Sequence, residues 1–258
     1  MIAVEETGPA GAPPVLMLHA GVADRRSWAP LVEHLGVQTR CIRYDGRGYG
    51  DTVYEAEDGW SPVADAVAVM DAMNVSSAIV VGNSMGGGTA IDLALAYPDR
   101  VSALVLISPA ISGAPESELE TTAAELDGDI DAADERDDLD AVNQLETHFW
   151  LDGPGHAGRV TGSPRELFLD MNARALSATD PGEPAELPDA WSQLERIAVP
   201  ALFLAGSLDL RHFRTDASLA AASLDHGQYV ELPDTAHVPQ LESHELALRS
   251  IANFIAAR

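Results

Sequence analysis

Ser84 has the sequence surroundings in this chain that most clearly indicate covalent chemistry. It lies in Gly82-Asn-Ser-Met-Gly86, a G-x-S-x-G pattern between an apolar run at 78–82 and a segment at 85–97 with helical spacing. A strand, a tight turn and a helix in this order expose a nucleophilic serine, because the glycines let strand and helix approach closely. The N–H of Met85, at the start of the helix, would then be free to stabilise an oxyanion.

A nucleophilic serine needs a histidine as base and a carboxylate that orients the imidazole. In this chain order the acid and then the histidine should follow the serine, each in a loop after a strand. His237 lies just past an expected strand at 228–232, and Asp209 follows one at 199–205. We therefore predict Asp209 and His237 as the partners of Ser84. The alternatives for the acid are Asp216, Asp225 and Asp234.

A second donor to the oxyanion should come from the loop after an early strand. The run at 15–19 ends in His19-Ala-Gly-Val, where a glycine allows the backbone N–H to turn inward. We predict that this donor is Gly21, with Val22 as the next choice. His19 is expected to hold the loop by hydrogen bonds and to take no part in proton transfer.

The composition bounds the partners of the protein. The 258 residues carry a net charge of −26, and all 15 basic residues are arginine. Such a surface repels nucleic acid and anionic lipid, so we expect neither as a partner. The single cysteine, Cys41, excludes an internal disulfide and is expected to be a buried structural thiol. The start of the chain shows no signal-peptide pattern, which predicts a cytoplasmic protein, either a monomer or a homodimer.

Apolar runs of strand length alternate with helical patterns over two parts of the chain. Alternation of this kind predicts a mostly parallel sheet with helices on both faces, an α/β fold. The expected strands are 15–19, 39–44, 78–82, 101–107, 199–205 and 228–232. The expected helices are 27–35, 62–73, 85–97, 215–224 and 244–257. Residues 1–108 and 199–258 would form this core.

Residues 109–198 break the alternation and read as a helical cap inserted between two strands. They hold 21 acidic residues against 5 arginines, with helical patterns at 116–126, 139–150, 165–175 and 190–196. The acidic stretch 127–140 is expected to be a link or mobile loop. Apolar cap residues are the candidate walls of a substrate pocket, or contacts between cap and core: Leu145, Phe149, Trp150, Leu167, Phe168 and Met171. The cap arginines that could make a pocket cationic are Arg159, Arg165 and Arg174.

The chain resembles the α/β-hydrolase superfamily over nearly its whole length. The resemblance is carried by His19-Ala-Gly-Val, Arg43-Tyr-Asp-Gly-Arg-Gly-Tyr-Gly50, Gly82-Asn-Ser-Met-Gly-Gly87, Tyr97-Pro-Asp-Arg-Val101, Gly206-Ser-Leu-Asp209 and Ala236-His237. It implies a helical cap and a triad of Ser84, Asp209 and His237. The common His-Gly pair is His19-Ala20 here, which moves the glycine by one position. Within the superfamily the chain is most similar to capped esterases and lactonases, including enol-lactonases.

The motifs and the resemblance together predict a serine hydrolase that needs no cofactor and no metal. Its substrate would be a small carboxylic ester or lactone. The same triad could serve a carbon–carbon bond hydrolase of the meta-cleavage type, or a cofactor-free perhydrolase with haloperoxidase-like activity. From a different class, the chain could be a ligand sensor that keeps the triad and turns nothing over.

Overall fold

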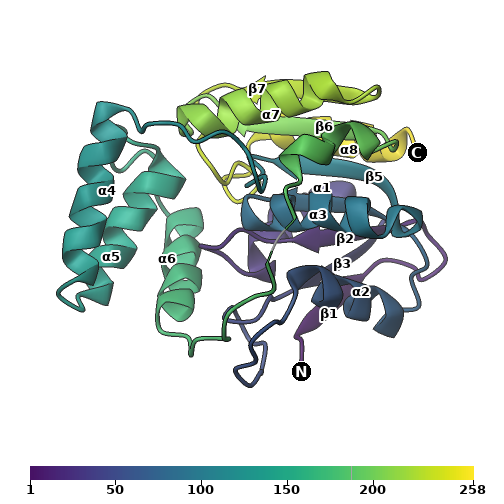
Figure 1. Ribbon diagram of the computed structural model, residues 1–258, viewed down its shortest axis with the longest axis horizontal. Helices are drawn as coiled ribbons and strands as arrows, with labels where there is room; N and C mark the ends of the chain where they lie inside the picture. Colours follow the sequence, from purple (N-terminus) through teal and green to yellow (C-terminus); the bar gives the residue numbers. More distant parts are fainter. Residues whose placement is uncertain (187) are drawn as a thin grey trace.

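The computed structural model describes residues 1–186 and 188–258. Within these residues the centre of the molecule is a seven-stranded sheet in the order β1-β3-β2-β4-β5-β6-β7 (Figure 1). Its strands are β1 (Val4–Thr7), β2 (Pro14–Leu18), β3 (Arg40–Tyr44), β4 (Ala78–Asn83), β5 (Val101–Ile107), β6 (Ala201–Gly206) and β7 (Gly227–Leu232). All neighbours pair in parallel except β1, which runs antiparallel to β3. The mostly parallel sheet is confirmed.

The edge strand β1 was not expected from the sequence. Its four residues, Val-Glu-Glu-Thr, contain two glutamates and none is fully buried. An edge strand needs no apolar run, because one of its sides faces solvent. Its register is set by backbone pairing with β3, from Val4 opposite Tyr44 to Thr7 opposite Cys41. Cys41 itself is buried, and burial raises its pKa to about 11, which fits an inert structural thiol.

Helices cover both faces of the sheet. Helices α2 (Pro62–Ala72), α3 (Met85–Ala96) and α7 (Arg211–Ser223) pack on one face, and α1 (Ala29–Leu35) and α8 (Glu245–Ala256) on the other. Side chains of a strand alternate between faces. Leu16 and Leu18 accordingly join the first cluster and Val15 and Met17 the second. The resulting sandwich holds the carboxyl ends of β4, β5 and β6 at one edge.

Two expected helices begin differently in the structure. The first expected helix, 27–35, starts as a 3₁₀ turn, η1 (Arg25–Trp28), because the Asp24 side chain accepts from the Arg26 N–H and caps it. Helix α7 begins at Arg211, four residues before the expected start, where the arginines and histidine of its first turn hid the apolar pattern. This earlier start places α7 directly after Asp209 and Leu210.

Helices α4 (Thr121–Asp134), α5 (Leu139–Glu146) and α6 (Ser163–Leu176) stand to one side of the sheet and form what we call the cap (Figure 1). Helix α5 continues into a π-helix, η3 (Thr147–Asp152). The expectation of a link at 127–140 was wrong for its first half. Helix α4 runs through to Asp134, because Ala123, Leu126 and Ala133 bury one face while the acidic residues face solvent.

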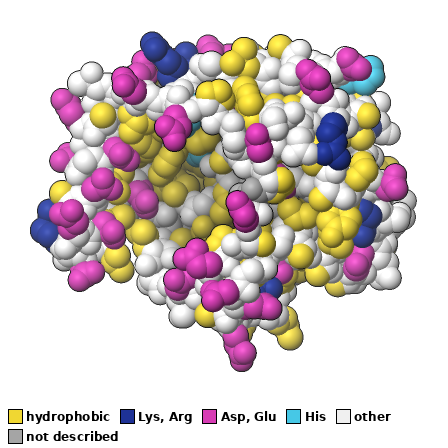
Figure 2. Space-filling view, in the orientation of Figure 1, with side chains coloured by type: hydrophobic (Ala, Val, Ile, Leu, Met, Phe, Trp, Pro, Cys, Tyr) yellow, Lys and Arg dark blue, Asp and Glu magenta, His cyan; other side chains and the backbone are white. Residues whose placement is uncertain are grey.

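The end of the expected cap segment packs on the sheet domain. The short helix η4 (Trp191–Arg196) follows the cap, and Ala190, Leu194 and Ile197 join the same apolar cluster as α2, α3 and α7. A further 3₁₀ turn, η2 (Pro98–Arg100), leads into β5. Figure 2 shows the surface hollowed between cap and sheet domain, with apolar side chains inside and acidic ones around. Among the described residues, no helix has the length and apolar character required to cross a membrane.

Candidate active site

Ser84 occupies a sharp turn between β4 and α3. Its backbone has φ 53° and ψ −116°, in the region with positive φ that residues with side chains rarely adopt. A Cβ atom on Gly82 would collide with the backbone of Gly86, and one on Gly86 would collide with the carbonyl of Leu18. The two glycines therefore have a steric reason to flank the serine, as the sequence pattern predicts.

The strained turn is stabilised by hydrogen bonds from neighbouring strands. The Ser84 N–H donates to the Ile107 carbonyl at 2.9 Å, and the Ser84 carbonyl accepts from the Ala110 N–H at 3.0 Å. The Gly86 N–H donates to the His19 carbonyl at 3.1 Å. Bonds on both sides of the serine hold a conformation that would otherwise cost about 1–3 kcal/mol.

The loops after β6 and β7 bring Asp209 and His237 into direct contact. The His237 Nδ1 lies 2.8 Å from Oδ2 and 3.0 Å from Oδ1 of Asp209, and both side chains are buried. The Asp209 carboxylate also accepts from the Ser108 hydroxyl at 2.6 Å and from the Leu210 N–H at 2.8 Å. Of the aspartates weighed from the sequence, Asp209 is the one that contacts His237.

Ser108 is a residue of the candidate site that the sequence analysis missed. It directly follows the last residue of β5, is fully buried and has φ 43°. The strained position aims its hydroxyl at Asp209. The signal available in the sequence was its place at the carboxyl end of a strand beside the serine-bearing strand, where polar side chains of α/β sheets converge.

Asn83 joins the serine turn to the histidine loop. Its side-chain amide donates to the carbonyls of Ile107, at 3.1 Å, and His237, at 3.0 Å. Its Oδ1 accepts from the side chain of Gln240 at 2.9 Å. Asn83 and Gln240 are both fully buried. This bridge holds the residues on either side of it, Ser84 and His237, in one rigid unit.

Aromatic side chains enclose the His237 ring. The centroid of the Trp150 ring lies 4.7 Å from that of His237, and the centroid of Phe213 lies 4.6 Å from it. Phe149 packs edge-on against Trp150 at 4.7 Å, and the Trp150 carbonyl accepts from the His237 N–H at 3.1 Å. The π-helix that carries Trp150 thus brings the cap onto the histidine. Phe213, on α7, was not foreseen because its helix was expected to begin later.

The other predicted pocket residues lie in two apolar clusters. Phe168 and Met171 are fully buried and pack α6 against Ala20 and Val238. Ala20 directly precedes Gly21, and Val238 directly follows His237. Phe149 and Leu145 pack with Phe213 and with α4. These positions connect cap to core, the second of the two roles considered from the sequence. Leu167 packs, partly buried, in the same cluster as Phe168 and Met171. A role for any of the six predicted residues as a pocket wall stays a prediction.

Gly21 lies across from the first residue of α3. A Cβ atom on Gly21 would be 3.9 Å from the Met85 sulfur and 3.5 Å from the Tyr49 hydroxyl, and that hydroxyl lies 3.6 Å from the same sulfur. Gly21 and Val22 also line a groove that runs toward the cap. The backbone N–H of Met85 is the first of its helix, where no intrahelical acceptor is available.

His19 braces the loop that carries Gly21. Its Nε2 accepts from the Gly46 N–H at 2.9 Å, so Nδ1 carries the proton and donates to the Ala20 carbonyl at 2.8 Å. Burial lowers the pKa of His19, which keeps the ring neutral and this pair of bonds intact. The structure therefore gives His19 the loop-holding contacts that the sequence suggested.

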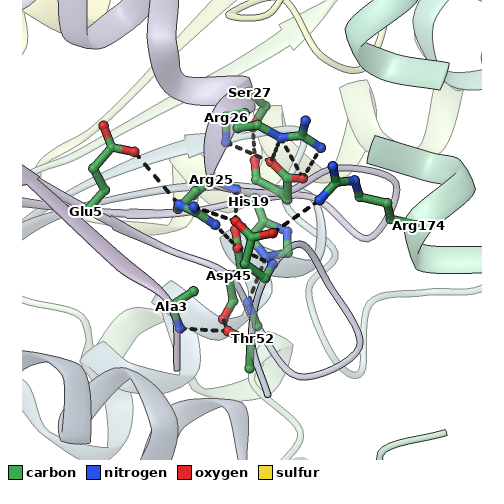
Figure 3. A network of polar contacts seen from close by, with 12 residues as sticks. Ala3, Glu5, His19, Arg25, Arg26, Ser27, Asp45, Thr52 and Arg174 are labelled. Atoms are coloured by element: carbon green, nitrogen blue, oxygen red, sulfur yellow. Dashed lines mark hydrogen bonds and ion pairs between the residues drawn. The ribbon is translucent and has the colours of Figure 1, made fainter. Parts of the chain in front are cut away.

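Behind His19, arginines and carboxylates tie the same loop to its surroundings (Figure 3). Asp45 accepts from the Arg25 side chain, from the Arg25 N–H at 2.8 Å and from the Asp51 N–H at 2.8 Å. Arg174 of α6 reaches Asp51 at 3.2 Å, so one ion pair of this network crosses from cap to core. A second crossing pair joins Arg26 to Asp170 at 2.7 Å.

The chain belongs to the α/β-hydrolase family, since a family model described as the alpha/beta hydrolase fold matches residues 13–244. It is 24% identical over 264 residues to 3-oxoadipate enol-lactonase 1 of Acinetobacter baylyi, covering 98% of this chain and 92% of that protein. It is 30% identical over 262 residues to the lipase LipV of Mycobacterium tuberculosis, and the match covers 95% of this chain and 94% of that protein.

Among solved structures, a thermophilic esterase from Thermogutta terrifontis superposes with a TM-score of 0.78 at 23% identity, covering 99% of this chain and 93% of that one. The family and fold predicted from the sequence are confirmed. The protein is a hydrolase of this family, with esterases and lactonases among its relatives.

Proposed function

We propose that this protein is a serine hydrolase that cleaves a small carboxylic ester or lactone through an acyl-enzyme on Ser84, with no cofactor. The observation that carries the proposal is the arrangement of three groups. Ser84 stands in a strained turn, Asn83 ties that turn to the backbone of His237, and Asp209 binds the His237 ring at 2.8 Å. Nucleophilic catalysis by a serine requires an accessible hydroxyl, a base, and a carboxylate that orients the base.

In the first half of the reaction, the Ser84 hydroxyl attacks the carbonyl carbon of the substrate. A C–O bond forms, and the serine proton passes to Nε2 of His237. Asp209 fixes the tautomer, because its carboxylate accepts the Nδ1 proton and so leaves Nε2 as the base. The negative charge on the carbonyl oxygen is received by the N–H groups of Met85 and Gly21, with Val22 as the alternative donor.

In the second half, the tetrahedral intermediate collapses and the C–O bond to the leaving alcohol breaks. The alcohol, or the freed hydroxyl of an opened lactone, takes the proton from His237. A water molecule then gives a proton to Nε2 and attacks the acyl carbon, which forms a second tetrahedral intermediate. Its collapse breaks the bond between the acyl carbon and Oγ of Ser84, and Oγ takes the proton back from Nε2 as the acid leaves. Trp150 and Phe213 exclude water from the sides of the His237 ring, which strengthens its electrostatic contact with Asp209.

The charge of the site favours substrates without several carboxylates. All three cap arginines considered from the sequence are paired: Arg159 with Glu242, Arg165 with Asp152, and Arg174 with Asp51 and Asp170. None of these arginines is left to neutralise a carboxylate of a substrate. This is the observation that ranks an ester or lactone above the doubly anionic substrates of a carbon–carbon bond hydrolase.

The test is hydrolysis of p-nitrophenyl esters from acetate to octanoate, together with simple lactones. We expect turnover by the wild type and a loss of roughly 10⁴-fold or more in Ser84→Ala. The matched control is Ser102→Ala, at an exposed position near the start of β5. A Ser84→Ala variant that keeps most of its activity would rule out the acyl-enzyme.

Labelling with a fluorophosphonate separates the remaining possibilities. Labelling of Ser84 without ester turnover would favour the carbon–carbon bond hydrolase. That activity is tested with a coloured dienol substrate, whose absorbance falls when the carbon–carbon bond is cleaved. A halogenation assay with acetate and hydrogen peroxide tests the perhydrolase alternative. Labelling with no turnover in any of these assays would indicate a ligand sensor. Failure of the serine to react at all would overturn the proposed function.

A further inference from the structure

A groove leads from the Gly21 loop along the cap. On its wall lies Glu146, whose carboxyl group accepts a hydrogen bond on one of its two oxygens. The groove has a volume of about 240 Å³ and runs between the core loops and the end of α6. Its lining includes Gly21, Val22, Tyr49, Glu146 and Asn172. Since a Cβ atom on Gly21 would lie 3.9 Å from the Met85 sulfur, this groove starts beside the two proposed oxyanion donors, Gly21 and Met85.

Glu146 is the last residue of α5, and a buried amide holds it in place. The Asn172 side chain, from α6, donates to Oε2 of Glu146 at 2.6 Å and to Oδ1 of Asn143 at 3.0 Å. Asn143 in turn donates to the Leu169 carbonyl at 3.0 Å. Asn172 is 1% exposed, so this chain of bonds fixes the carboxylate firmly.

The other half of the Glu146 carboxyl group is without such support. Within residues 1–186 and 188–258, no hydrogen bond reaches its Oε1 and no arginine or histidine pairs with it. Burial raises the pKa of Glu146, which reflects the cost of a charge withdrawn from water without a cationic neighbour. A donor brought by a ligand would compensate that cost.

Among the described residues that line the groove, Arg47 is the one cation, and it is already neutralised. Arg47 donates to both oxygens of Asp65, at 2.9 and 3.1 Å, and to Glu57 at 3.0 Å. Its guanidinium also lies over the Trp60 ring. Two carboxylates therefore face one arginine, and Glu146 and Asp180 add further negative charge to the lining. A ligand that ends in a carboxylate meets repulsion here, whereas an ammonium or hydroxyl group meets an acceptor.

We propose that Glu146, fixed by Asn172, binds an ammonium or hydroxyl group on the acyl part of the substrate. The protein would thus select acyl esters that end in a hydrogen-bond donor over those that end in a carboxylate. This inference rests on the proposed function for the bond that is cleaved. The selecting residue comes from the cap, whereas the reacting groups come from the sheet domain.

The test compares four p-nitrophenyl esters of similar length: 6-aminohexanoate, 6-hydroxyhexanoate, heptanoate and the monoester of hexanedioic acid. We expect wild-type kcat/KM to be highest for the amino ester and lowest for the carboxylate. In Glu146→Gln, which keeps an acceptor for Asn172, the ratio of amino ester to heptanoate should fall by about tenfold or more. The matched control is Glu166→Gln, an exposed glutamate on α6, which should leave the ratio unchanged.

A second readout needs no turnover. In the Ser84→Ala background, hexylammonium should raise the melting temperature, and Glu146→Gln should remove that shift. An unchanged substrate ratio in Glu146→Gln, or preference for the carboxylate ester in the wild type, would overturn the inference and leave the proposed function intact. If the wild type hydrolyses no ester, the proposed function fails and the thermal shift alone decides whether Glu146 binds the ammonium group.

Discussion

The sheet edge and the cap hold their carboxyl groups in opposite ways. At the sheet edge, Asp209 accepts from Ser108, Leu210 and His237, so both of its oxygens are bound. In the cap, Glu146 accepts from Asn172 on one oxygen. A carboxylate that is fully bound is suited to orient a neighbour, and one that is half bound has capacity left for a ligand. In the proposed function, the sheet domain thus orients the reacting groups and the cap selects the substrate.

The largest effect should come from breaking the sheet-edge side of this comparison. Asp209→Asn removes the carboxylate that selects the His237 tautomer, so kcat/KM for an ester should fall by about 10⁴-fold. Asp225→Asn, an exposed aspartate weighed as an alternative in the sequence, serves as the control and should change little. Steady-state rates on one p-nitrophenyl ester measure both. Equal losses in the two variants would show that Asp209 has no special role.

Ser108→Ala should make Asp209 more like Glu146, because it removes one of the hydrogen bonds that the Asp209 carboxylate accepts. Loss of its hydroxyl frees one lone pair of the buried carboxylate, which weakens the hold on His237. We expect kcat to fall by roughly tenfold with KM nearly unchanged. The pH profile of kcat/KM should also shift, which separates a positioning role from lost stability. A variant with a normal profile and normal kcat would remove Ser108 from the site.

Asp92, on α3, provides a third case, a buried carboxyl group that contacts neither Asp209 nor Glu146 through a hydrogen bond among the described residues. It is 5% exposed, its Oδ1 has no hydrogen-bond partner among the described residues, and burial raises its pKa to about 6. The folded state holds this proton up to about pH 6 and the unfolded chain only to about pH 4. Stability therefore falls as pH rises through that window, and the whole cost is present at pH 7.

Asp92→Asn should consequently raise the free energy of unfolding at pH 7 by about 1–2 kcal/mol. The gain should shrink as the pH is lowered from 6 to 4, where Asp92 in the wild type regains its proton. Thermal unfolding at pH 4, 5.5 and 7 measures this trend. A gain of the same size at all three values would mean that the cost is not one of ionisation.

The smallest effect is expected where the cap meets the core through exposed ions. Arg174 is 45% exposed and its partner Asp51 is 58% exposed, so their pair at 3.2 Å is screened by solvent and adds little to stability. Arg174→Gln should lower the melting temperature by less than about 3 °C. The difference from wild type should vanish in 1 M salt, where such pairs are screened. A larger loss that survives high salt would show that α6 depends on this arginine for packing.

Sequence patterns predicted the candidate residues at the sheet edge but not those in the cap. Gly82, Ser84 and Gly86 were identifiable because a steric requirement of the turn leaves a pattern in adjacent residues. The contact between Asp209 and His237 followed from chain order and the strands before them. Glu146 and Asn172 lie on two helices and meet through packing, so no spacing along the chain predicts their bond. Ser108 falls between these cases. Its place directly after β5 was visible in the sequence, but the orientation of its hydroxyl toward Asp209 could not be predicted from it.

The π-helix η3 (Thr147–Asp152) gives this chain a particular vulnerability to insertions and deletions. A π-turn holds one more residue than an α-turn, and each residue of an α-helix rotates its successors by about 100°. Loss of a single residue here would let the helix relax to α-form and turn Trp150 away from His237. A substitution that conserves side-chain size should leave the contact between Trp150 and His237 in place. Insertion or deletion of one residue in the segment should break that contact and separate the cap from the histidine. The length of this short segment should therefore matter to the contact between Trp150 and His237 as much as the aromatic side chains themselves.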